Sequence, residues 1–177
     1  MFDALKNWMR RRSLRHAASA EPTALMPLGK VRSATVFIDV EDTSFDVCKN
    51  EIMAFFRNKG IKGEIFFFDF RRLNEGERLI TSITNTVLKK DINWFGKPSK
   101  EKVSLMLDGN PDMFISLLAN DGFPIHYMAA ASRARFKVGR VPLPGKVFDL
   151  VVQDPENGPL SEAGIFREMV KILERIQ

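Results

Sequence analysis

The chain has little of what stabilises a secreted or membrane protein: one cysteine, and no apolar run of about 18 residues that would cross a bilayer. A single cysteine, Cys48, cannot form an intramolecular disulfide, which favours a reducing compartment. Four arginines interrupt residues 1–16, so the pattern of a secretory signal segment is missing. At 177 residues the chain is long enough to bury a core without disulfides or metals. These absences predict a cytoplasmic protein.

Signatures of catalysis are equally scarce. The only histidines, His16 and His126, have no second histidine, cysteine or acid at ligand spacing, which argues against a zinc site. A Walker loop, a Gly-x-Ser-x-Gly elbow and a glycine-rich dinucleotide fingerprint are all missing. Cys48 falls on the apolar side of a helix predicted over residues 44–59, so we interpret it as a core residue. The sequence therefore favours a non-catalytic ligand- or protein-binding domain over an enzyme.

The excess positive charge lies at the N-terminus. The chain has 27 basic and 22 acidic residues, and residues 1–33 hold seven basic and two acidic ones. The first 33 residues therefore carry the whole net charge of +5, and the rest of the chain is neutral. A nucleic-acid-binding domain normally carries its basic stripe on the folded domain, so nucleic acid is an unfavoured partner.

The basic segment has the pattern of an amphipathic helix over residues 1–20. Its apolar residues fall on one side of a helical wheel, namely Phe2, Leu5, Trp8 and Met9. Two interpretations stay open: residues 1–16 bind an anionic membrane surface, which would make the protein peripheral to the inner membrane, or the helix packs on the folded domain. Small residues, prolines and a glycine over 21–32 predict a linker, so the domain covers residues 33–177.

Strand and helix patterns alternate through residues 33–177. Short apolar runs predict strands over residues 34–40, 64–70, 113–119, 136–140 and 147–152. Amphipathic or capped segments predict helices over residues 44–59, 99–109, 125–134 and 161–176. Residues 71–90 are ambiguous and are compatible with a helix followed by a strand. This alternation predicts a Rossmann-like α/β domain, a three-layer sandwich with a mostly parallel sheet of five or six strands.

The first predicted strand ends in three carboxylates. Asp39-Val-Glu41-Asp-Thr43 has no glycine and repels anions, so it is a poor phosphate cradle. It resembles the Asp-x-Asp-x-Thr that opens haloacid-dehalogenase-type phosphatases. The resemblance implies Asp39 as a nucleophile beside Mg²⁺, with Glu41 as the acid and base. Glu41 departs from the family's pattern, and no later lysine or acidic pair completes it. The alternative interpretation is an acidic turn that suits the following helix dipole.

The string Asn93-Trp-Phe-Gly-Lys-Pro98 is the other candidate site. Trp94 and its neighbour would stack a planar ligand, Asn93 would line the site, and Lys97 would hold an anionic group. The alternative is that the aromatics plug the edge of the core. Asn120 and Asp121 follow the strand over 113–119, where parallel sheets bind ligands, and they complete the candidates for an unidentified small molecule or protein partner.

The same hexapeptide carries a resemblance to a known family. Together with Phe136-Lys-Val-Gly139 and Phe148-Asp-Leu-Val-Val152, it resembles an uncharacterised family of small bacterial proteins, a domain of unknown function. The similarity covers about residues 34–177 and implies no activity.

Residues 112–140 show a weaker similarity to the N-terminal domain of heptosyltransferase-like glycosyltransferases. Those enzymes bind the sugar nucleotide mostly through a second domain, for which this chain has no room. The similarity therefore implies a glycosyltransferase-like fragment, and it favours binding over transfer.

Overall fold

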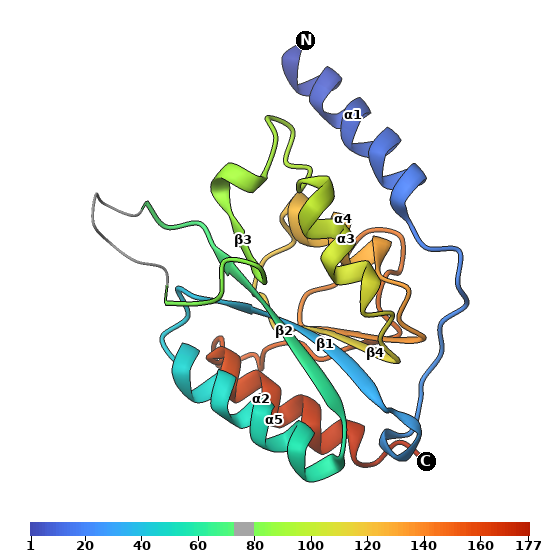
Figure 1. Cartoon of the computed structure of the whole chain (residues 1–177), viewed down its shortest axis with the longest axis vertical. Helices are drawn as coiled ribbons and strands as arrows, with labels where there is room; N and C mark the ends of the chain where they lie inside the picture. The colour runs from blue at the N-terminus through green and yellow to red at the C-terminus, as the bar shows by residue number, and fades with distance from the viewer. Residues whose placement is uncertain (73–79) are drawn as a thin grey trace.

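A computed structural model of the chain describes residues 1–72 and 80–177 (Figure 1). Six strands form one sheet in the order β3-β2-β1-β4-β5-β6, and all five neighbouring pairs are parallel. The strands are β1 (Ser33–Asp39), β2 (Lys62–Asp69), β3 (Thr86–Leu88), β4 (Met113–Ser116), β5 (Phe136–Gly139) and β6 (Leu150–Val151). This is the strand order of doubly wound nucleotide-binding folds, so the predicted Rossmann-like α/β fold is confirmed.

Helices cover both faces of the sheet. The α-helices of the described residues are α1 (Phe2–Ala17), α2 (Phe45–Lys59), α3 (Lys100–Asp108), α4 (Phe123–Ala131) and α5 (Glu162–Leu173). Helices α2 and α5 lie side by side on one face, and α3 and α4 lie on the other, with α1 against α4 (Figure 1). Both faces must be covered because the strands are apolar on both sides. None of these helices is long and apolar enough to span a membrane.

Alternation along the central strand divides the core into two halves. Val36 and Ile38 on β1 pack toward α2 and α5, whereas Phe37 points to the other face. Phe37 meets Phe114 on β4 edge to face, with ring centroids 4.6 Å apart. Cys48 is fully buried on the α2 side, and burial raises the pKa of its thiol. The interpretation of Cys48 as a core residue is therefore confirmed.

The ends of helices α2 and α3 lie close to the predicted ends, at residues 59 and 99–109, but glycine and serine do not act at every end in the usual way. Gly60 ends α2 in the left-handed region, at φ +66°, and the Ser99 hydroxyl caps α3. Gly109, however, keeps a right-handed conformation, and Asn110 carries the positive φ. Ser44 stands at the N-cap of α2 without capping it, because its hydroxyl accepts a hydrogen bond from the N–H of Ala163 on α5. The chain therefore uses this hydroxyl to join two helices.

The later strands are shorter than their apolar runs. β4 ends at Ser116 and β6 has only two residues, because the flanking apolar residues pack in loops at the sheet edge. The predicted strand in the ambiguous stretch is found as β3. The helix expected before it falls partly on residues 73–79, which lie outside the described residues. Of the phenylalanines on and just after β2, Phe66 and Phe68 are buried, whereas Phe67 and Phe70 are half-buried.

Candidate functional site

The strand order reverses between β1 and β4, and open α/β sheets of this order bind ligands beyond the strand ends at that point. We call this place the switch point. Here it is filled by Glu162, the first residue of α5, whose side chain is buried. Both carboxylate oxygens of Glu162 accept the backbone N–H of Asp39, at 3.0 Å each. An internal carboxylate therefore occupies the position next to β1.

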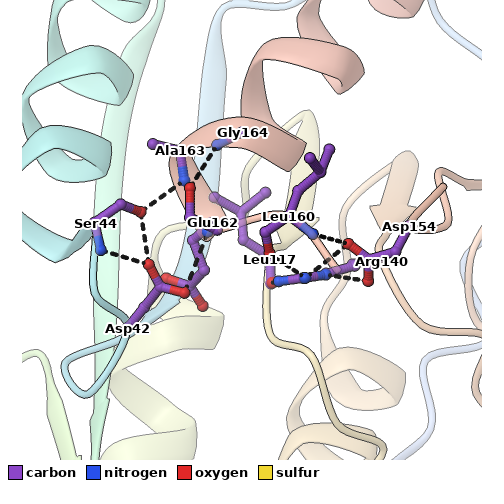
Figure 2. A network of polar contacts seen from close by, with 10 residues as sticks. Asp42, Ser44, Leu117, Arg140, Asp154, Leu160, Glu162, Ala163 and Gly164 are labelled. Atoms are coloured by element: carbon purple, nitrogen blue, oxygen red, sulfur yellow. Dashed lines mark hydrogen bonds and ion pairs between the residues drawn. The ribbon is translucent and has the colours of Figure 1, made fainter. Parts of the chain in front are cut away.

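The N-terminus of α5 is also used internally. The N–H of Glu162 donates to the Asp42 carboxylate, and the N–H of Ala163 donates to the Ser44 hydroxyl. The N–H of Gly164 donates to the Ser161 hydroxyl, 3.2 Å away. A helix N-terminus attracts anions through amides of this kind. At α5 these amides already have partners, two of them from the loop after β1 (Figure 2).

Arg140 closes the same region from the β4 side. Its guanidinium is 2% exposed and pairs with Asp154 through two hydrogen bonds, of 2.8 and 2.9 Å. It also donates to the carbonyls of Leu117, just after β4, and of Leu160, just before α5 (Figure 2). Arg140 thus ties the ends of three elements together with every contact made inside the chain.

Burial and neighbouring carboxylates govern the protonation of this region. Burial, reinforced by Asp42 and Asp39, raises the pKa of Glu162 to about 8. Burial also raises the pKa of Asp39 from its ordinary value, and Glu41, Asp42 and Asp69 add to the rise. A carboxyl with a pKa of about 8 keeps its proton near neutral pH, so Glu162 adds little negative charge to the switch point.

The two residues of the phosphatase interpretation lie together in the loop after β1. The Asp39 side chain is half-buried and its Oδ1 accepts the N–H of Glu41 at 2.8 Å, while Glu41 itself is exposed. Within residues 1–72 and 80–177, no three His, Cys, Asp or Glu side chains are arranged to hold a metal ion. The catalytic role of Asp39 and the Mg²⁺ beside it stay predictions. The charged groups that act on Asp39 are the carboxylates of Glu41, Asp42 and Asp69.

The hexapeptide forms a tight loop over residues 92–98, which we call the motif loop. An antiparallel bridge between Ile92 and Pro98 closes the loop. The Asn93 Oδ1 accepts the backbone N–H groups of Phe95 and Lys97, so this side chain is engaged in shaping the turn. Gly96 has φ +95°, a conformation that favours glycine. Asn93 and Gly96 thus have a structural reason in the turn itself.

The motif loop is also where α1 docks. The Arg10 Nε donates to the carbonyl of Phe95 at 2.6 Å, and its guanidinium lies over the Phe123 ring, 5.1 Å from the centroid. Phe95 is buried with Phe123 and Tyr127 in a small cluster against α1. The predicted alternative, in which the aromatics of the hexapeptide plug the core edge, fits Phe95. Trp94 instead stays exposed and contacts the ring of Phe2, with centroids 5.2 Å apart.

A hollow of about 270 Å³ lies between α1 and the motif loop, and we call it the α1 groove. Its lining residues come from α1, the motif loop and α4, and they are Met9, Arg12, Ser13, His16, Ala17, Phe95, Lys97 and Tyr127. Three of them carry cationic or basic groups and none is acidic. Among the described residues, Arg12, His16 and Lys97 have no ion pair with a carboxylate, and the Lys97 Nζ lies 5.6 Å from the Tyr127 ring. The groove is an apolar cleft with cations at its rim.

The remaining predicted residues are not brought together. Asn93 and Trp94 line a different hollow, of about 470 Å³, with Phe70, Lys89 and Ile92. Asn120 and Asp121 are exposed in the turn before α4, where the Asn120 Oδ1 accepts the N–H of Gly122. Asn93 and Lys97 also line a third hollow together, of about 380 Å³, next to Asp91. The predicted ligand site is therefore spread over several hollows around the motif loop and the turn before α4.

Comparison with family models gives a match that runs from residue 5 to residue 176 and describes a family of unknown function (DUF6913). The chain belongs to this family. The match includes α1 and the segment that follows it, which the resemblance based on the hexapeptide, beginning at about residue 34, left out. No curated protein and no solved structure matches the chain. The similarity of residues 112–140 to glycosyltransferases stays a prediction.

Sequence reasoning missed most of the α1 groove in this family member. Arg12, Ser13 and His16 recur at the three- and four-residue spacing of one helix side, and this was the available signal. Tyr127, the only tyrosine of the chain, gave no such signal within an alanine-rich helix. Glu162 at the first position of α5 reads as an ordinary helix-starting acid, so its role at the switch point was also missed.

Proposed function

We propose that the chain is a non-catalytic binding domain whose α1 groove takes a small anionic ligand, carrying a phosphate or carboxylate group on an aromatic or apolar body. Buried charged and polar groups in folded proteins normally have partners. At the switch point these partners are internal, through Glu162 and Arg140. In the α1 groove, cations surround apolar walls with no carboxylate opposite. This contrast is the observation that carries the proposal.

The groove suits one charged group and one ring. The walls formed by Phe95 and Tyr127 offer aromatic surface, while Arg12 and Lys97 stand on opposite sides, one on α1 and one on the motif loop. Guanidinium and ammonium groups bind phosphate and carboxylate through charge-assisted hydrogen bonds. The volume of about 270 Å³ lies near the lower limit for small-molecule pockets, so the ligand is small. We place this binding in the cytoplasm because the chain has a single cysteine.

Titration of the full-length protein with phenyl phosphate tests the proposal, with phenol as the neutral control. We expect saturable binding of phenyl phosphate, followed by calorimetry, and much weaker binding of phenol. Lys97→Gln and Arg12→Gln should each weaken phenyl phosphate about tenfold, because each removes one charge-assisted contact worth about 1.5 kcal/mol.

Arg57→Gln is the matched control, since Arg57 is exposed on α2 on the opposite face of the sheet. It should leave phenyl phosphate binding unchanged. Binding that Arg57→Gln weakens as much as Lys97→Gln would reflect the overall charge and contradict the proposal. Equal binding of phenol and phenyl phosphate would do the same.

A further inference from the structure

Helix α1 docks on the domain with a different side from its apolar side. The residues that turn toward the domain and are half-buried are Lys6, Met9, Arg10, Ser13, Leu14 and Ala17. The opposite side leaves Leu5 and Trp8 about half exposed, at 50% and 49%. Of the apolar stripe seen in the sequence, Met9 is half-buried against the domain, and Phe2 touches the Trp94 ring but stays 66% exposed. An exposed tryptophan and leucine on a helix that is already held in place call for another partner.

Arginines surround these apolar residues on the outward side. Arg11, Arg12 and Arg15 are exposed, and within the described part of the chain they form no ion pair. The Arg12 guanidinium lies over the Trp8 ring, 5.4 Å from its centroid. Residues 1–33 carry the whole net positive charge of the chain. The partner of this side must therefore be both apolar and negatively charged.

We infer that the outward side of α1, with Leu5 and Trp8 among Arg11 and Arg15, docks on an anionic lipid bilayer. This inference concerns a different surface from the α1 groove and does not depend on ligand binding there. Peripheral attachment takes two signals, apolar insertion and attraction of basic residues to acidic headgroups, and α1 supplies both. Tryptophan favours the membrane interface because its ring is apolar and its N–H is polar.

The position of α1 favours a bilayer over a protein partner. The helix lies at the outside of the domain, and its N-terminal turns project past the loops around it (Figure 1). Phe2 at this projecting end is 66% exposed, and its ring contacts that of Trp94, which is 51% exposed. Apolar side chains on a projecting helix end need a complementary pocket in a protein partner, whereas they enter the headgroup region of a bilayer without one.

Co-sedimentation of the full-length protein with vesicles tests this inference. We expect binding to phosphatidylcholine vesicles that contain about 30% phosphatidylglycerol and little binding to phosphatidylcholine alone. Raising the salt from about 0.05 to about 0.5 M should weaken binding severalfold. In a Trp94→Phe variant, the emission of Trp8 should shift to the blue on addition of the anionic vesicles.

The double variant Leu5→Ser, Trp8→Ser should weaken vesicle binding at least about tenfold, since it removes both inserted side chains. The matched control is Val47→Ser, Met53→Ser, which changes two residues of similar exposure, 49% and 50%, on α2. This control should bind vesicles like the original protein. The single variant Leu5→Ser changes a residue that does not line the groove and leaves the Trp8–Arg12 contact in place, so it should weaken vesicle binding and keep normal binding of phenyl phosphate, which separates this test from that of the groove.

Three results would overturn the inference. One is sedimentation with anionic vesicles that the α1 and α2 doubles reduce equally. Another is failure of the full-length protein to bind anionic vesicles at low salt. If the unaltered protein instead self-associates in sedimentation velocity, and only the α1 double is monomeric, the outward side serves a second copy and the bilayer assignment is wrong.

Discussion

Two regions of this molecule place charged side chains beside apolar surface, and they differ in whether those side chains have partners within the chain. At the switch point, Glu162 and Arg140 are buried and bonded to backbone groups and to partner side chains. At the α1 groove, Arg12 and Lys97 have no carboxylate partner in the described structure. The first arrangement holds the fold together, whereas the second leaves charge available for a ligand. The usual ligand position of a fold therefore need not be the site of a given chain.

The largest effect should come from breaking the switch point. Arg140→Met removes a buried guanidinium, which leaves Asp154 without its cation and with only the N–H of Leu160, and leaves two carbonyls without this donor. We expect the free energy of unfolding to fall by about 3–5 kcal/mol, because breaking a buried ion pair leaves an uncompensated charge. Urea unfolding measures this. Arg167→Gln, at the exposed pair with Glu51, is the control and should change the stability little. A loss near zero for Arg140→Met would refute the closed switch point.

A second prediction concerns the pH dependence of stability. The ordinary pKa of Glu162 is 4.5 and burial raises it to about 8, so its contribution to stability is complete below about 4.5 and declines as the pH rises through about 8. Glu162→Gln mimics the protonated acid and should remove this decline, which amounts to at most about 1.4 kcal/mol per pH unit. Urea unfolding between about pH 5 and 7.5 gives the difference.

The variant-minus-original difference is needed because other groups titrate in the same window. The lowered pKa of His126 gives an opposite slope, in which stability falls as the pH drops, and the raised pKa of Asp39 gives a slope of the same sign as that of Glu162. His126 and Asp39 are present in both proteins, so their contributions largely drop out of the variant-minus-original difference. Parallel curves for the two proteins would mean that Glu162 is ionised in the folded state, contrary to our account.

The smallest effect should be a local one, at the wall of the α1 groove. Arg10→Gln loses the hydrogen bond to Phe95 and the contact with the Phe123 ring, so docking of α1 should weaken by about 1–2 kcal/mol. Hydrogen exchange of the α1 amides should become faster while the sheet is unaffected. Arg11→Gln, one residue further on the exposed side, is the control. Equal exchange in the two variants would show that α1 does not depend on Arg10.

The sequence predicted the sheet well because burial on both faces leaves a local pattern. The strand over residues 34–40 and the helix over residues 44–59 could be found from the order of adjacent residues alone. The polar contacts of the switch point could not, because Asp39 and Glu162 are joined over 123 positions of the chain. A contact between residues so far apart leaves no periodic pattern in the sequence around either one. Only the three-dimensional structure shows that Asp39 and Glu162 meet at the switch point.

The hexapeptide shows the same limit of local patterns. Its residues were expected to form one ligand site, but the Asn93 side chain accepts a backbone N–H of the loop itself, whereas Lys97 lines the α1 groove. Residues 2–17 form the helix α1, yet the side that docks is not the apolar one. A sequence period shows that a helix has two sides, and packing decides which side is covered.

Chemical-shift mapping of the full-length protein with phenyl phosphate tests the central claim most directly, since both regions report in one spectrum. The account predicts shifts for the amides of residues 12–17 and 92–98, and none beyond noise for residues 39–44 and 160–164. Shifts confined to residues 39–44 and 160–164 would place the ligand at the switch point and contradict the account.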